Sequence, residues 1–174
     1  MISGVRIVKQ TSLILAIVLS VAVQGSIFAA ITPMESSIEA FTQQIEKNPD
    51  AALAYSNRAS LKFLKKDVQG AIADFDKAIQ INPNNPELYL NRGYIKQIVN
   101  DFAGAMQDYN TALKVRPNFA YAYNNRGVLK VAMKDIQGAM DDYAKALELN
   151  PRYSDVIRNN FSTNHRANRI MYQD

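Results

Sequence analysis

The sequence predicts an all-α protein, a solenoid of helix–turn–helix repeats, from two observations. Past residue 30, Pro recurs every 34 residues, at Pro49, Pro83, Pro117 and Pro151. Aromatic, aliphatic and Asn positions keep the same spacing, which is the length of one helix–turn–helix unit. These columns are Phe41, Phe75, Tyr109 and Tyr143; Ile45, Ile79, Leu113 and Leu147; and Asn57, Asn91, Asn125 and Asn159.

The segment 118–151 illustrates how one repeat is predicted to fold. We expect Asn118 to cap its first helix and Asp135 to cap its second, because their side chains can accept hydrogen bonds from free N–H groups. Pro151 ends the second helix, since the residue before Pro is forced out of the α region. In the preceding repeat, Pro86 falls in the first helical turn, where its missing N–H is harmless.

Small residues recur where the two helices of a repeat are expected to touch. Large side chains at these positions would hold the helices apart, so we expect close backbone contact there. The positions are Gly93, Gly127, Ala71, Ala105 and Ala139, with Ala59 in the corresponding place of the first repeat.

Charged residues also repeat. An Arg precedes an Asp by sixteen residues three times, as Arg58 and Asp74, Arg92 and Asp108, and Arg126 and Asp142. This offset predicts a ladder of Arg–Asp pairs within or between repeats, or alternatively an anion-binding strip. The acid pairs Asp74/Asp76 and Asp141/Asp142 are expected on solvated helix faces rather than at a metal or acid–base site.

The repeat resembles the tetratricopeptide repeat (TPR) family, whose pattern is W-x2-L-G-x2-Y, then A-x3-F, then P. It aligns onto 50–151 without a gap, with Tyr55, Tyr89 and Tyr123 at the Trp position, but with Arg at the Leu position and Lys at the Tyr position. The N-R-G-x-x-K motif resembles a bacterial, often cyanobacterial or plastid-lineage, form of the family.

The resemblance implies a right-handed α-solenoid of three full repeats and eight helices. The expected units are repeats 50–83, 84–117 and 118–151, a half-repeat cap helix in 31–49, and a cap helix with a tail in 152–174. Half-repeat caps are expected because a terminal repeat has only one neighbour.

Composition excludes several classes of function. The chain has no Cys and one His, His165, so disulfides, thiolate chemistry and a metal site are not expected. The net charge of +4 includes Arg6 and Lys9 of the N-terminal segment, so charge gives nucleic-acid binding little support. No phosphate loop, nucleophile elbow or metal motif occurs. We expect no enzyme activity and no cofactor.

Residues 1–30 have the pattern of a secretory signal peptide. Basic residues precede an apolar run over 13–23, and small residues follow it. The sequence therefore predicts an exported protein of the periplasm, the thylakoid lumen or the exterior. The alternative is an uncleaved membrane anchor over 13–31, close to the length of a spanning helix.

In the TPR family the first helix of each repeat lines a concave groove, which implies a site here. Helical spacing places the predicted groove residues opposite the face that meets the second helix. They are Leu53, Asn57, Phe63, Leu90, Asn91, Tyr94, Gln97, Tyr121, Asn124, Asn125 and Val128, with Ser56, Ser60, Glu87 and Val131 on the same stripe. The Asn column could instead bond neighbouring helices and hold the stack together.

We therefore expect a protein-interaction scaffold that binds an extended or helical peptide segment of another protein, without nucleic acid. The stripe lacks basic residues where chaperone-binding members clamp a terminal carboxylate, so no such clamp is expected. Two alternatives are a self-associating repeat protein, which would form a homo-oligomer, and a membrane-anchored assembly factor. A membrane is involved only if the N-terminal segment is retained.

Overall fold

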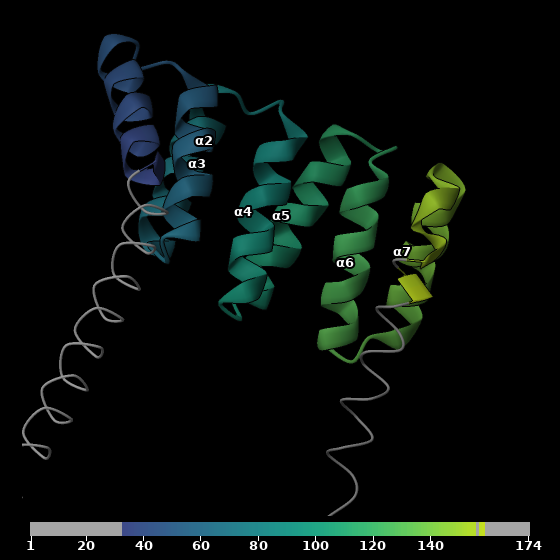
Figure 1. Cartoon of the computed structure of the whole chain (residues 1–174). Helices are drawn as coiled ribbons and strands as arrows, with labels where there is room; N and C mark the ends of the chain where they lie inside the picture. The colour runs from purple at the N-terminus through teal and green to yellow at the C-terminus, as the bar shows by residue number, and fades with distance from the viewer. Residues whose placement is uncertain (1–32, 156, 159–174) are drawn as a thin grey trace, which may run out of the picture.

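Three pairs of antiparallel helices, preceded by one further helix, make up the fold (Figure 1). The computed structural model describes residues 33–155, 157 and 158. The helices are 33–47, α2 (Ala52–Leu64), α3 (Val68–Ile81), α4 (Pro86–Ile98), α5 (Phe102–Val115), α6 (Ala120–Ala132) and α7 (Ile136–Leu149), followed by the 3₁₀ turn η1 (Pro151–Tyr153). The described residues contain no strand, in agreement with the predicted all-α fold.

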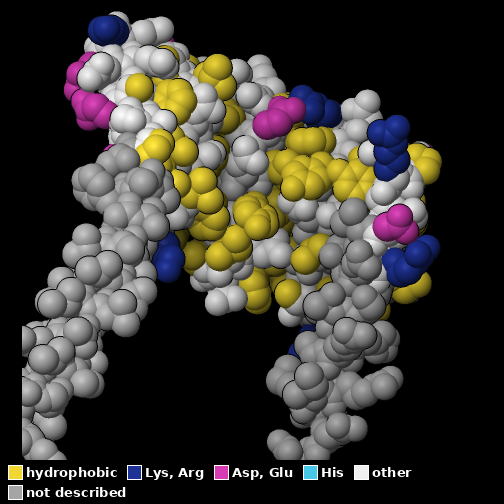
Figure 2. Space-filling view, viewed as in Figure 1, with side chains coloured by type: hydrophobic (Ala, Val, Ile, Leu, Met, Phe, Trp, Pro, Cys, Tyr) yellow, Lys and Arg dark blue, Asp and Glu magenta, His cyan; other side chains and the backbone are white. Residues whose placement is uncertain are grey.

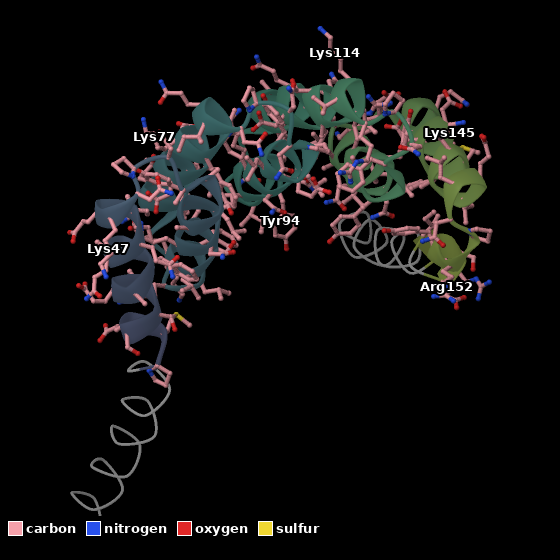
Figure 3. All side chains as sticks on the ribbon, turned by 90° about the horizontal axis from the view of Figure 1, so that it is seen from above. Lys47, Lys77, Tyr94, Lys114, Lys145 and Arg152 are labelled. Carbon is pink, nitrogen blue, oxygen red and sulfur yellow. The ribbon has the colours of Figure 1, made fainter. Side chains whose placement is uncertain are left out.

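The pairs stack side by side into an arc. The closest partners are α2 with α3, α4 with α5, and α6 with α7, while α3 meets α4 and α5 meets α6 between repeats. Figure 3 shows Tyr94 on the inner side of this arc and Lys77, Lys114 and Lys145 on its outer side. None of the helices in the described part of the chain is long and apolar enough to cross a membrane.

The second helix of every repeat begins with an Asp cap. Asp67, Asp101 and Asp135 each accept a hydrogen bond from the backbone N–H three residues later. This confirms the predicted role of Asp135. The turn before each cap contains a residue in the left-handed region, and this residue is Lys66, Asn100 or Lys134, with φ of 63–65°.

The first helices begin less uniformly. Asn85 caps α4. Pro86 lies in the first turn of this helix, which confirms its predicted place. The predicted cap Asn118 is wrong, because the cap position of α6 is Phe119, whose side chain accepts no hydrogen bond. Asn85 and Phe119 occupy the same position of successive repeats, 34 residues apart. Asn118 therefore lies one residue before the cap position.

Glycine allows the two helices of a repeat to touch. A Cβ built on Gly93 would lie 2.9 Å from Cε1 of Tyr109, and one on Gly127 would lie 2.8 Å from Cε1 of Tyr143. Ala71, Ala105 and Ala139 are fully buried on the opposite helices. The predicted small-residue contacts are therefore confirmed, and they let bulky rings fill the space between the helices.

The flanks follow the repeat pattern as far as the structure describes them. The N-terminal cap helix extends over 33–47 and buries Ile45. After η1, Ser154 and Asp155 are helical and Ile157 is buried against α7. Seven α-helices thus lie in the described residues. Most of the predicted eighth helix, the segment 1–32 and His165 lie outside them.

Candidate functional site

The predicted Arg–Asp ladder forms within each repeat. Nε and Nη2 of Arg58 donate to the two carboxylate oxygens of Asp74, both at 2.8 Å. The ammonium of Lys62, one helical turn after Arg58, lies 2.8 Å from Oδ2 of the same carboxylate. Burial by itself would raise the pKa of Asp74, but hydrogen bonds from both cations outweigh it and lower this pKa below its usual value.

The other two repeats copy this arrangement. Arg92 donates to Asp108 at 2.9 and 2.5 Å, and Arg126 donates to Asp142 at 2.9 and 2.6 Å. Lys96 and Lys130 supply the second cation at 2.9 Å, just as Lys62 does for Asp74. The three carboxylates are buried.

The prediction that the acid pairs lie on solvated helix faces is wrong for one member of each pair. Asp74 and Asp142 do not lie on solvated faces, because each is buried between two cations from the first helix of its repeat. The lysines were not assigned to the ladder, although their place one helical turn after each Arg was a usable signal.

Each Arg also bridges to the preceding helical unit. Nη1 of Arg58 donates to Oγ1 of Thr42, Nη1 of Arg92 to Asp76, and Nη1 of Arg126 to Oδ1 of Asn110. The guanidinium also lies over the ring of the Tyr three residues earlier, 5.5–5.9 Å from its centroid. The cations of the ladder are therefore occupied in holding the stack.

The concave face is mainly apolar. Tyr94 and Tyr121 are each 49% exposed, and Leu53 and Leu64 are also exposed. Figure 2 shows hydrophobic side chains gathered over this face, with Lys, Arg, Asp and Glu mostly at its edges. Aromatic rings of this kind provide rigid contact area for a partner.

A cavity of about 350 Å³ opens in the concave face between the first and second repeats. Its walls come from α2, α3 and α4, and the lining residues are Ser60, Phe63, Leu64, Phe75, Asn91, Tyr94 and Ile95. The rings of Phe63 and Tyr94 meet edge to face, 6.5 Å apart and inclined by 74°. The cavity is mainly apolar, and Asn91 is the one amide among its lining residues. The hydroxyl of Ser60, which also lines it, donates a hydrogen bond to the carbonyl oxygen of Ser56.

Most predicted groove residues are accessible. Leu53, Asn91, Tyr94 and Tyr121 are exposed, while Asn57, Phe63, Asn125 and Val128 are half-buried. Gln97 is also half-buried, and its Oε1 accepts a hydrogen bond from the hydroxyl of Tyr109 at 2.8 Å, which links the two helices of its repeat.

Leu90 and Asn124 were wrongly predicted to line the groove. Leu90 is 2% exposed and packs in a core with residues of α5 and α6, and Asn124 is 4% exposed. Helical spacing identified the face that meets the second helix of the same repeat, but a first helix also contacts its neighbour in the next repeat. That second contact covers Leu90, which packs against residues of α6.

Three residues that line the cavity were not predicted from helical spacing. Leu64, Phe75 and Ile95 contribute walls to the cavity but were not among the predicted groove residues. Leu64 is the last residue of α2 and comes directly after the predicted groove residue Phe63. An apolar residue at this place could have been predicted to line the groove. Tyr153 was missed as well, and its ring lies 6.4 Å from that of Tyr121. Among the described residues, no group of His, Cys, Asp and Glu is arranged to hold a metal ion.

Family and structural comparisons agree with this geometry. A family model described as TPR repeat matches residues 59–97 and 100–134, and one described as tetratricopeptide repeat matches 120–153. Together the matches cover more than half of the chain. No curated protein matches it in sequence.

Solved structures of similar fold include two TPR domains. A crystal structure of MamA has a TM-score of 0.63 and 23% identity, over 68% of this chain and 69% of that one. The first TPR of Spaghetti (RPAP3), bound to the HSP90 peptide SRMEEVD, has a TM-score of 0.60 and 26% identity, over 67% and 92%. The Arabidopsis OM64 TPR domain has a TM-score of 0.57 and 24% identity, over 60% and 86%. These likenesses show an all-α solenoid.

Proposed function

The chain belongs to the tetratricopeptide repeat family, and from that premise we propose that it is a protein-interaction scaffold that binds a segment of a partner protein on its concave face. The observation that carries the proposal is the apolar cavity between α2 and α4, which opens beside the exposed side chains of Leu64 and Tyr94.

The cavity suits the side chains of a partner protein. Its volume of about 350 Å³ lies at the lower end of the range for ligand pockets, enough for one or two apolar side chains. Burying a Val, Leu or Phe side chain contributes about 1.5–3 kcal/mol. Asn91 can both donate to and accept from a peptide backbone beside that anchor. Binding of a short segment is therefore supported by one apolar anchor and one amide.

A terminal carboxylate is not expected to be the recognised feature. The Spaghetti TPR domain of similar fold holds an acidic HSP90 peptide. In this chain, Arg92 and Lys96 of the central repeat are bound to Asp108, and the other two repeats bind their equivalents in the same way. The cations of the ladder are thus unavailable to an acidic ligand. The groove should favour a neutral, apolar segment.

Site-specific photo-crosslinking tests this proposal. A benzophenone amino acid placed at Tyr94 lies on the inner side of the arc, and one placed at Lys114 lies on its outer side (Figure 3). In the cells that make the protein, we expect the first probe to form a covalent adduct with a partner segment, and the second to give no adduct with that segment. Equal labelling from both positions, or none from Tyr94, would reject the groove as the binding surface.

Self-association is the first alternative function. It would require repeats of two molecules to stack end to end, so the surface of the first helix is relevant to it. The exposed residues of the helix over 33–47 include Glu39, Gln43 and Glu46. A polar outer face of this kind is typical of a capping helix and disfavours end-to-end stacking. The mass of the protein measured by light scattering separates this alternative from the groove, because self-stacking would raise it above that of a monomer.

Export belongs to the same proposal and depends on the sequence pattern of residues 1–30. The N-terminal residue of the protein recovered from cells distinguishes its two forms. A start near residue 31 indicates a cleaved signal and a partner across the membrane. An intact N-terminus with recovery in the membrane fraction indicates the anchored assembly factor.

A further inference from the structure

The first helix of the stack, at one end of the arc in Figure 1, runs antiparallel to α2. Near the middle of this helix over 33–47, Oγ1 of Thr42 accepts a hydrogen bond from Nη1 of Arg58 at 3.1 Å. At its start, Oε1 of Glu35 accepts one from Nζ of Lys65 at 2.9 Å. The start of the first helix therefore lies beside the end of α2.

This end of α2 also forms part of the cavity in the concave face. Lys65 directly follows Leu64, whose exposed side chain lines the cavity. One lysine side chain and one residue step thus separate Glu35 from the wall of the cavity. Phe28 lies seven residues before Glu35, and seven extended residues span roughly 23 Å. Phe28 is therefore close enough along the chain to reach the cavity.

The residues that precede the first helix have the chemistry that the cavity accepts. No charged residue occurs between Lys9 and Glu35, and Phe28 is the one aromatic residue of this stretch. The cavity is likewise lined without any charged residue. On its wall, the rings of Phe63 and Tyr94 meet edge to face, and a third ring can extend such a pair. An uncharged segment with one aromatic side chain matches this space.

We propose that the segment 24–32 occupies the cavity in the unprocessed chain, with the ring of Phe28 against Phe63 and Tyr94. The cavity opens to the partner when this segment is cleaved off or inserted into a membrane. A protein that starts near residue 31 lacks Phe28 and has an open cavity. This inference rests on the proposed function, since it specifies how the same cavity is regulated.

Tethering makes even weak docking of the segment effective. A short linker gives a tethered group an effective concentration of about 1 mM. A segment whose free peptide binds with a Kd of about 100 µM would then fill the cavity in roughly nine-tenths of the chains. A competing ligand binds only to the remaining chains, so its apparent Kd should be about tenfold higher.

Disulfide trapping in the whole, uncleaved chain tests the docking. The protein has no Cys, so two introduced cysteines form one defined pair. Under mild oxidation, we expect Ala29→Cys with Leu64→Cys to close within one molecule at least about tenfold faster than Ala29→Cys with Glu39→Cys. Glu39 is exposed on the first helix and nearer to residue 29 in the sequence, so a segment without a docking place would reach it at least as readily. Non-reducing electrophoresis separates closed monomers from linked dimers.

Peptide binding shows whether the docked segment closes the cavity. The probe is a fluorescently labelled peptide of residues 24–32 with capped ends, and its binding to the whole chain is followed by anisotropy. We expect it to bind the Phe28→Ala chain about tenfold more tightly than the parent, because the cavity of that variant is open. Val21→Ala, which shortens an apolar residue upstream of the docking segment, is the matched control and should bind the peptide as the parent does. Adding Tyr94→Ala to Phe28→Ala should remove most of the gain.

The outcomes separate this inference from the proposed function. If the pairs at Leu64 and Glu39 close at equal rates, or if Phe28→Ala binds the peptide no better than the parent, the inference is overturned. In that case, a partner adduct from the benzophenone probe at Tyr94 leaves the proposed function standing. Docking of the segment without any partner adduct from Tyr94 rejects the proposed function and leaves the intramolecular docking in place.

Discussion

The buried carboxylate of Asp108 allows a direct measurement of what the ion-pair ladder contributes to stability. Asp108 receives two hydrogen bonds from Arg92 and one ion pair from Lys96, and its side chain is 3% exposed. Asp108→Ala removes the carboxylate that neutralises both cations. The matched control is Asp76→Ala, because Asp76 pairs with the same Arg92 but is 55% exposed.

The magnitude follows from burial. Removing one partner of a buried ion pair costs about 3–5 kcal/mol, because the other charge is left without compensation. Arg92 is 17% exposed and keeps Asp76, so the lower end of this range applies and we expect a loss of about 3 kcal/mol. An exposed pair contributes about 0–1 kcal/mol. The two variants delete the same charge and should differ by at least about 2 kcal/mol.

Urea unfolding followed by circular dichroism at equal protein concentration is the assay. The free energy of unfolding falls by about 1–3 kcal/mol per molar urea. Asp108→Ala should therefore lower the urea midpoint by about 1–3 M, and Asp76→Ala should lower it by about a few tenths of a molar. If the two variants lose the same stability, burial of the carboxylate is not what makes the ladder important, and the reasoning is refuted.

Three further predictions concern a glycine, a turn and acid stability. Gly93→Ala places a Cβ 2.9 Å from the buried ring of Tyr109. Strain should exceed the gain of about 1 kcal/mol in helix propensity, and we expect urea unfolding to show a net loss of about 1–2 kcal/mol. Lys134→Gly should raise the free energy of unfolding by about 0.5–1 kcal/mol in thermal denaturation, because φ at Lys134 is 65°. The pKa of Asp74 is lower in the folded than in the unfolded chain, so its contribution is complete above about pH 5. As the pH falls below about 4 and through the folded pKa, the unfolded chain binds more protons, and urea midpoints should fall.

Controls accompany each of these measurements. Lys145→Gly, within α7, should destabilise where Lys134→Gly stabilises, since only the turn residue has positive φ. A Gly93→Ala protein that gains stability would show that the ring of Tyr109 can move aside. Asp74→Asn should reduce the fall in stability below about pH 4. If stability falls with pH as in the parent protein, other carboxylates determine its acid dependence.

Local signals in the sequence were enough to predict the helices. The cap at Asp135 and the first-turn Pro86 depend on residues within one helical turn, and both are confirmed. Asn118 was wrong by one residue because α6 begins at Ala120, which puts the cap position at Phe119 although its side chain cannot cap.

Contacts within one repeat were also predictable. The Arg–Asp offset of sixteen residues and the small residue Gly93 repeat with the period, so the same pair geometry recurs in every unit. The lysines of the ladder belong to this class. Lys96 lies one helical turn after Arg92 and therefore on the same face, which the sequence already displayed.

The groove was predicted less well. The sequence placed Tyr94 and Tyr121 on an accessible face, and both are half exposed. It also placed Leu90 and Asn124 there, and both are buried. Whether a residue of a first helix faces the groove or the next repeat depends on how far one repeat is rotated against another.

Period, caps and the pairing inside each repeat were thus determined by the sequence alone, because they depend on neighbours along the chain at constant offsets. The cavity between α2 and α4, the contact of the Phe63 and Tyr94 rings and the burial of Leu90 were decided only by the tertiary structure. They depend on the angle and distance between repeats, which arise from packing many side chains at once.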